Sequence, residues 1–201
     1  WGWKMMATHK LRILGMKWNN VRNFEKLGLG TGDNHFEQEG WTLMQIQNNY
    51  GKTTTMHLLR SCLTGIKMPR DKLTGYRYRK GRTDWGGDPE ARPEFSVMLK
   101  LDDEIFQIRT VIDWKKGEQE FHTYRENAGG DRPGWSPPTY FRSLFEGKKQ
   151  FAELLVLDGE VAKEMNRATT ENTIGKAIRQ VTGLEAVCDL IDEEGGTGRI
   201  S

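Results

Sequence analysis

Cysteine and histidine are scarce in this sequence, which narrows the kinds of site that it can build. Its 201 residues include 2 cysteines and 4 histidines. Cys62 and Cys188 lie far apart and form no CxxC pair, and the histidines show no ligand-like spacing with each other or with the cysteines. A zinc site is therefore not expected. Reduced cysteines are the simplest interpretation, although the two could in principle be bridged.

Long apolar runs are also missing. No stretch reaches the ~20 residues that a helix needs to cross a bilayer, and residues 1–10 lack the continuous apolar region of a secretory signal. The sequence thus predicts a cytoplasmic protein without a membrane partner. The formal net charge is only +2, so a surface for nucleic acid would have to be local. GxSxG is absent, and no Ser, His and Asp arrangement suggests a nucleophilic triad.

What the sequence does contain is an ordinary globular balance, with 36% hydrophobic and 29% charged residues. The two ends are the exception. Residues 1–10 open with Trp-Gly-Trp-Lys-Met-Met and are interpreted as a leader or a cloning remnant, and the glycine-rich residues 195–201 are interpreted as a flexible tail. The folded part is therefore expected within residues 11–194.

The spacing of apolar residues predicts both strands and helices, as in an α/β fold. Alternating or β-prone runs predict strands at Leu11–Trp18, Trp41–Ile46, Phe95–Leu101, Ile105–Trp114, Glu120–Arg125 and Phe151–Leu157. Helical patterns cover residues 52–63, which Gly65 ends, and also Tyr140–Phe145 and Glu171–Glu194. Residues 67–92 and 127–138 are expected to be irregular. The turn residues 102–104 and 116–117 make residues 95–125 a succession of antiparallel hairpins.

The strongest candidate site is a phosphate-binding loop at residues 46–54, Ile-Gln-Asn-Asn-Tyr-Gly-Lys-Thr-Thr. In such a loop, backbone N–H groups at a helix N-terminus converge on the nucleotide phosphates. A lysine reaches the β- and γ-phosphates, and the hydroxyl that follows holds Mg²⁺. Gly51, Lys52 and Thr53 supply the second half of GxxxxGK[ST] between a predicted strand and a predicted helix.

The first half of this motif is altered. Ile46 stands where the pattern has glycine, and a β-branched residue crowds such a turn, so weakened ATP affinity is expected. Asn49 stands at a position that often holds glycine, and asparagine tolerates positive φ. The alternative interpretation is that Gly-Lys-Thr-Thr merely opens an ordinary helix.

Three segments, in this order, resemble the N-terminal ATPase segment of SMC-like, ABC-class ATPases. Residues 11–14 (LRIL) leading to 20–24 (NVRNF) resemble the family's opening strand and its N-F-R turn. Residues 47–54 resemble its P-N-G-x-G-K-T-T loop. Residues 157–160 (LDGE) resemble the Q-loop segment, which often reads F-D-G-E in the ATPases of bacterial DNA-phosphorothioation systems. The family also includes the RecF and RecN proteins and the double-strand-break repair ATPase that partners a nuclease.

The resemblance implies an α/β P-loop NTPase head. Residues 11–170 would form its N-terminal lobe, residues 95–125 the β-rich antiparallel part, and residues 171–194 the helical start of a coiled coil. It also implies ATP and Mg²⁺ as ligands. The residues that would bind the nucleotide are Arg22, Asn48, Asn49, Tyr50, Gly51, Lys52, Thr53 and Thr54.

For the metal ion, the resemblance implies Thr53 and Asp158. Asp158 would also be the catalytic residue near the attacking water, and its carboxylate suits a hard, oxygen-seeking cation. Two alternatives stay open: Asp158 as a turn-forming Asp-Gly residue, and Arg22 as a solvated surface arginine.

Two parts of a complete ATPase are not found in the sequence: an apolar run ending in Asp-Glu that would serve convincingly as Walker B, and a Ser-Gly-Gly signature. In SMC-like proteins both lie in a C-terminal lobe beyond a long coiled coil. The resemblance therefore implies a C-terminal head lobe and a homodimer copy as partners, with a nuclease subunit in some relatives. Hydrolysis by this chain alone is not expected, because the general-base carboxylate is lacking.

A basic stretch at residues 67–82 is the candidate nucleic-acid surface. It holds Lys67, Arg70, Lys72, Arg77, Arg79, Lys80 and Arg82, interleaved with Tyr76 and Tyr78 and opposed only by Asp71. Such residues could grip phosphates while the tyrosines stack on bases, and Arg77, Arg79 and Lys80 are expected to contact DNA. A solvated loop and strand edge is the alternative.

The preferred interpretation is the ATP–Mg²⁺-binding half of an SMC-like ATPase acting on DNA, in repair or in anti-phage defence. A rival is a degenerate, non-hydrolysing head that serves as a structural or interaction module, which Ile46 favours. A second rival is a small-molecule phosphotransferase, for which the sequence offers no recognisable lid or acidic base.

Overall fold

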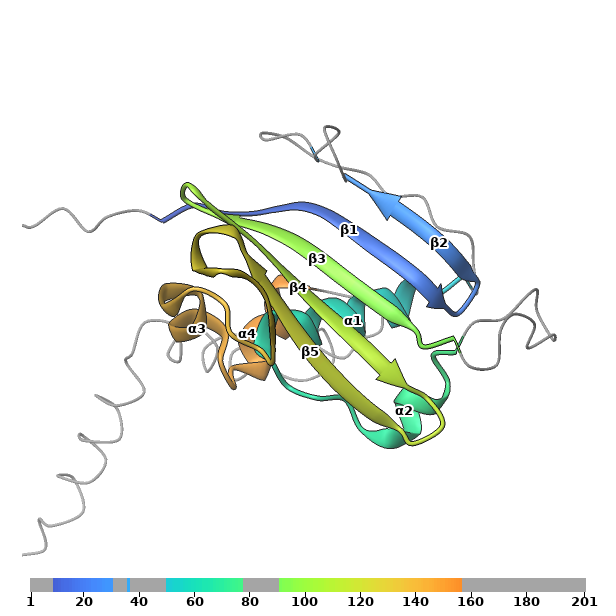
Figure 1. Cartoon of the computed structure of the whole chain (residues 1–201). Helices are drawn as coiled ribbons and strands as arrows, with labels where there is room; N and C mark the ends of the chain where they lie inside the picture. Colours follow the sequence, from blue (N-terminus) through green and yellow to red (C-terminus); the bar gives the residue numbers. More distant parts are fainter. Residues whose placement is uncertain (1–8, 31–35, 37–49, 78–90, 157–201) are drawn as a thin grey trace, which may run out of the picture.

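An antiparallel sheet organises the described part of the chain, residues 9–30, 36, 50–77 and 91–156 of a computed structural model (Figure 1). Its six strands lie in the order β2-β1-β3-β4-β5-β6. Their bounds are β1 Leu11–Val21, β2 Phe24–Leu29, β3 Glu94–Leu101, β4 Glu104–Asp113, β5 Glu118–Arg125 and β6 Gly130–Pro133. The α/β class with a β-rich part is therefore confirmed.

The sheet has one apolar face because successive side chains of a strand point to opposite sides. In β3, the buried side chains of Phe95, Val97 and Leu99 alternate with Ser96, Met98 and Lys100, which point to the other side. Phe106 and Ile108 do the same in β4, so the two strands form the hairpin that the alternation predicts. Asp102, at φ 53°, makes the tight turn between them, in a left-handed conformation that aspartate tolerates.

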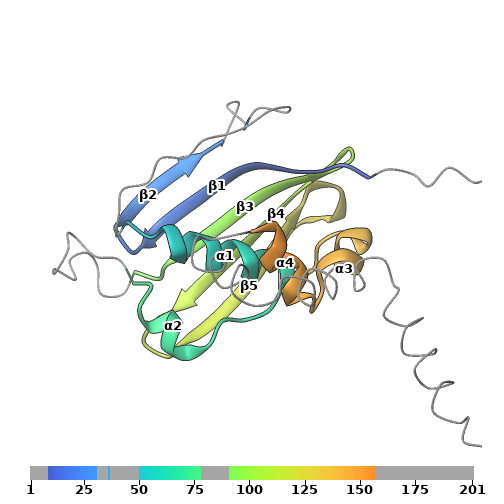
Figure 2. The ribbon, with the colours of Figure 1, turned by 180° about the vertical axis from the view of Figure 1, so that it is seen from behind.

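The described helices lie on this apolar face, as the two opposite views show (Figures 1 and 2). They are α1 Lys52–Thr64, α2 Arg70–Thr74, α3 Thr139–Phe145 and α4 Lys149–Leu155. α1 lies against the sheet and also contacts α3 and α4. Its Leu58, Leu59 and Leu63 are buried in the same core as Trp18 of β1. α1 ends at Gly65, whose φ of 71° supplies the left-handed cap that glycine favours.

Several predicted elements are confirmed: the strand from Leu11, the helix from Lys52, the strand at β5 and the short helix at α3. Three predictions are wrong. Residues 151–155 belong to helix α4, not to a strand. The region 67–92, expected to be irregular, contains helix α2. The region 127–138, also expected to be irregular, contains strand β6, which follows a 3₁₀ turn at Glu126–Ala128. The predicted strand Trp41–Ile46 and helix Glu171–Glu194 lie outside the described residues, as do the two ends.

Helix α4 forms because its buried residues recur at a helical spacing. Ala152 and Val156, four residues apart, are both buried, and the Val156 N–H donates to the Ala152 carbonyl at 2.9 Å. Arg60 of α1 donates from Nε and Nη2 to the Val156 carbonyl at 2.9 and 2.5 Å. This tertiary contact holds the end of α4 against α1. None of the described helices has the length and apolar content that crossing a bilayer requires.

Cys62 is expected to be unreactive in the folded protein. Its thiol is free and fully buried in α1, and this burial raises its pKa far above the ordinary value. The reactive thiolate is therefore suppressed. In a Cys188→Ser background, iodoacetamide at mildly alkaline pH should leave the native chain unmodified and alkylate the urea-unfolded chain, as followed by mass spectrometry. Rapid alkylation of the native chain would contradict the buried position.

Candidate functional site

The turn between β1 and β2 meets the first turn of α1. Arg22 occupies this turn at φ 53°, and its Nε donates to the Thr54 hydroxyl at 3.3 Å. A Cβ placed on Gly51 would lie 3.6 Å from the Cβ of Arg22 and 3.6 Å from the ring of Phe24. The structure thus brings Arg22 together with the start of the predicted phosphate loop helix.

Gly51 is the residue that allows this entry into α1. Its φ of 102° lies in the region that L side chains rarely adopt. No side chain caps the first turn that follows, and that turn holds no acidic residue. A helix start of this kind presents backbone N–H groups and the positive end of the helix dipole, which together favour an anion.

Side-chain exposure divides the loop residues into two groups. Lys52 and Thr53 are exposed and Tyr50 is 41% exposed, so a ligand at the helix start can reach all three. Thr54 and Thr55 are buried and serve to fix the helix. Of the other predicted site residues, Asn48, Asn49, Asp158, Arg79 and Lys80 lie outside the described residues, as does Ile46.

Trp18 anchors the start of α1 to the sheet. This indole is fully buried, and its Nε1 donates to the Thr55 hydroxyl at 3.1 Å. The rings of Phe24 and Phe95 lie 5.7 and 5.5 Å away between centroids, and Phe24 in turn lies 6.4 Å from the ring of Tyr50. Sequence reasoning did not assign Trp18 to the site. The only available signal was its place on the inward-facing phase of the first strand.

Arg22 is further held by the segment that follows α2. Its backbone N–H donates to the Tyr76 carbonyl at 3.1 Å, and its guanidinium carbon lies 6.0 Å from the centre of the Tyr76 ring. The Tyr76 hydroxyl lies 2.9 Å from Nδ1 of His57 on α1. Burial raises the pKa of Tyr76 to about 12, against the opposing effect of the Arg22 charge. Tyr76, itself held by His57 of α1, thus fixes the position of Arg22.

Tyr76 therefore corrects one part of the predicted nucleic-acid surface. Its ring is only 4% exposed, so it cannot stack on bases. Arg77 pairs with Val21 in an isolated β-bridge, and its guanidinium carbon lies 4.8 Å from the centre of the Trp114 ring. This places Arg77 between the β1–β2 turn and the end of β4.

Oxygen ligands suited to Mg²⁺ are few at this site, as is usual where phosphates complete the coordination. The exposed hydroxyl of Thr53, at the start of α1, is one such ligand. Within residues 9–30, 36, 50–77 and 91–156, no three His, Cys, Asp or Glu side chains gather to hold a metal ion.

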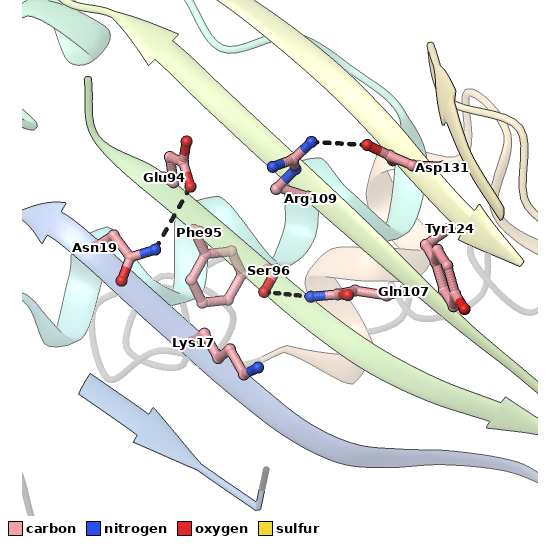
Figure 3. A pocket seen from close by; sticks show the side chains of 9 residues that line it. All are labelled: Lys17, Asn19, Glu94, Phe95, Ser96, Gln107, Arg109, Tyr124 and Asp131. Atoms are coloured by element: carbon pink, nitrogen blue, oxygen red, sulfur yellow. Dashed lines mark hydrogen bonds and ion pairs between the residues drawn. The ribbon is translucent and has the colours of Figure 1, made fainter. Parts of the chain in front are cut away.

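A separate cavity of about 300 Å³ lies on the face of the sheet opposite the described helices (Figure 3). Its polar groups largely satisfy one another. Arg109 pairs with Asp131 at 2.9 Å, Asn19 donates to Glu94 at 3.4 Å, and Gln107 donates to Ser96 at 2.7 Å. A ligand would have to compete with these contacts, so the cavity is a weaker candidate than the start of α1.

The fold and the site together define an α/β protein in which a β-turn arginine faces an uncapped helix N-terminus. Comparison of the chain with protein-family models, with curated proteins and with solved structures finds no match.

Proposed function

We propose that this chain is the ATP–Mg²⁺-binding N-terminal part of an SMC-like, ABC-class ATPase head that acts on DNA. One observation carries the proposal. Arg22, from the turn whose sequence resembles the family's N-F-R turn, lies against the helix that begins with Gly51-Lys52-Thr53-Thr54. A helix that merely opened with these residues would not require a cation from a distant turn beside it.

Each residue has a role that its position supports. The N-terminus of α1 attracts the phosphates through its N–H groups and dipole. Lys52 and Arg22 bring positive charge to the same place, and Thr53 offers a hydroxyl to Mg²⁺. When bound, Mg²⁺ neutralises charge on the phosphate oxygens. Trp18 and Thr55 keep the helix start in register with the turn.

Binding without turnover is the expected activity of the isolated chain. Its sequence has no convincing Walker B run and no signature motif, so the general base would come from a C-terminal head lobe or a second chain. Asp158 belongs to this proposal as the carboxylate near the metal. DNA repair and anti-phage defence are the two proposed settings, and the second of them follows only from the resemblance of residues 157–160.

A degenerate head is the second candidate function, and Ile46 is the observation that favours it. Such a head would keep the fold and the packing around Trp18 without binding nucleotide. The Arg22 guanidinium beside the helix start argues for retained binding, because a purely structural helix start does not require a cation there.

Replacing Lys52 with alanine is expected to abolish Mg²⁺-dependent binding of a non-hydrolysable ATP analogue, measured by isothermal titration calorimetry. Loss of a charge-assisted contact of about 1.5–3 kcal/mol weakens affinity by roughly 10- to 150-fold. Because Ile46 already weakens the site, this loss would take binding beyond detection.

Lys26→Ala is the matched control, since Lys26 is an exposed lysine of β2 away from the helix start. It should bind the analogue as the unmodified chain does. If neither the unmodified chain nor Lys52→Ala binds, even after a C-terminal lobe is supplied, the degenerate module is the correct function.

A further inference from the structure

A second cavity, of about 260 Å³, lies among the helices that cover the sheet, between α1, residues 66–72 and α4. We call it the basic groove. Its charged and titratable side chains are those of His57, Arg60, Lys67, Lys72, Lys149 and Glu153. Lysine or arginine thus reaches the groove from all three of its walls, and Glu153 is the single acidic side chain among the described lining residues.

Two lysines of the basic groove have no acidic partner among the described residues. Lys67 and Lys72 are exposed, and neither forms an ion pair within the described part of the chain. Lys149 lies 3.7 Å from Glu153, but its side chain is 71% exposed, so water screens this pair. In the cavity on the opposite face of the sheet, by contrast, Arg109 is already paired with Asp131.

The walls of the basic groove are fixed by hydrogen bonds. Arg60 is bound to the Val156 carbonyl, which ties α1 to the end of α4. On the opposite wall, the Met68 N–H donates to Oε1 of Gln119 at 2.8 Å. Nε2 of the same glutamine donates to the Ser61 hydroxyl at 2.9 Å, so Gln119 links residue 68 to α1. The groove is therefore a formed feature of the fold.

We propose that the basic groove binds the sugar–phosphate backbone of a nucleic-acid strand. Its cations are spread over three elements, which suits a chain of phosphates better than one small anion. No Phe, Tyr or Trp side chain lines its described part, so base stacking would contribute little and binding would be largely independent of sequence. The inference rests on the proposed function in taking DNA as the target.

This surface differs from the one expected from sequence. Lys67 and Lys72 belong to the predicted basic stretch, whereas Arg60 and Lys149 come from α1 and α4 and join them only in the folded chain. Arg77, which lies over Trp114, does not line the groove.

The test measures binding of a fluorescent single-stranded oligonucleotide by anisotropy over a series of salt concentrations, without nucleotide. The double variant Lys67→Ala/Lys72→Ala should bind roughly tenfold more weakly at low salt. Its plot of log affinity against log salt should be shallower by about 1.4, because two phosphate contacts are lost. Lys17→Ala/Lys26→Ala, which removes two exposed lysines of β1 and β2, should match the unmodified chain.

Glu153→Gln supplies a result that a folding defect cannot imitate. Removing the acidic group of the groove should strengthen oligonucleotide binding several-fold. Equal losses in the two double-lysine variants, or no gain with Glu153→Gln, would overturn the proposal. Absence of oligonucleotide binding by the unmodified chain would also overturn it. Lys52→Ala separates the two proposals, since it should retain oligonucleotide binding while losing the ATP analogue.

Discussion

Replacing Trp18 with alanine is expected to lower the free energy of unfolding by about 3–5 kcal/mol, as for other buried Trp and Phe residues. The indole is fully buried between β1 and α1, beside Phe24 and Phe95. Its removal leaves a cavity and also deprives the buried Thr55 hydroxyl of its donor. Urea unfolding followed by circular dichroism would measure the loss, which could unfold a marginally stable chain.

Trp18→Phe is the matched variant. It retains an aromatic ring against Phe24 and Phe95 but removes the indole N–H and part of the ring volume. We expect about 1–2 kcal/mol of destabilisation, clearly less than with alanine. Equal losses in the two variants would show that the ring retained by phenylalanine adds little to stability at this position.

Gly15→Ala is expected to destabilise the chain by about 3 kcal/mol, the upper part of the usual range for overpacking. A Cβ on Gly15 would lie 2.0 Å from the carbonyl oxygen of Gly30 and 2.8 Å from that of Leu29. Both obstacles are backbone atoms, which cannot rotate away as a side chain can. The added Cβ would force β1 away from the end of β2. The register of β1 against β3 also shifts at this position, between Ile13 and Gly15.

Gly75→Ala is the control for this substitution. Gly75 has a φ of −83°, and its added Cβ would meet only the Lys72 carbonyl oxygen, at an ordinary 3.5 Å. The alanine lowers the conformational entropy of the unfolded chain, so the free energy of unfolding should stay unchanged or rise by about 0.4–1 kcal/mol. The difference in urea midpoint between the two alanine variants tests the close approach at Gly15. Similar midpoints would contradict it.

The hairpins and α1 could be predicted because their signals are local. β3 and β4 alternate cleanly around a turn at Asp102, and α1 lies between Gly51 and Gly65. Local signals failed for β6, whose residues Gly130–Pro133 contain no β-branched or aromatic side chain to suggest a strand. That strand exists because its backbone pairs with β5.

Local signals were insufficient for helix α4 and for the contact of Arg22 with Thr54, because both depend on residues that lie far apart in the sequence. The apolar run from Phe151 fits a buried strand as well as a helix, and the contact of Arg60 with Val156 links residues 96 apart. The contact of Arg22 with Thr54 joins residues 32 apart. Spacing alone could not reveal it, and only the resemblance to a known family suggested that Arg22 belongs to the site. Tyr76 was placed on the surface because nothing local marks it as buried.

The make-up of β6 bears on how copies of this chain associate. An outer strand with free backbone groups invites another strand to pair with it and so to begin aggregation. Among the described strands, β6 is outermost beside β5, is only four residues long, and carries the charged, exposed Asp131 and Arg132. Pro133 contributes no N–H donor. This edge is therefore a poor template for intermolecular strand addition, which should favour association of copies through other surfaces.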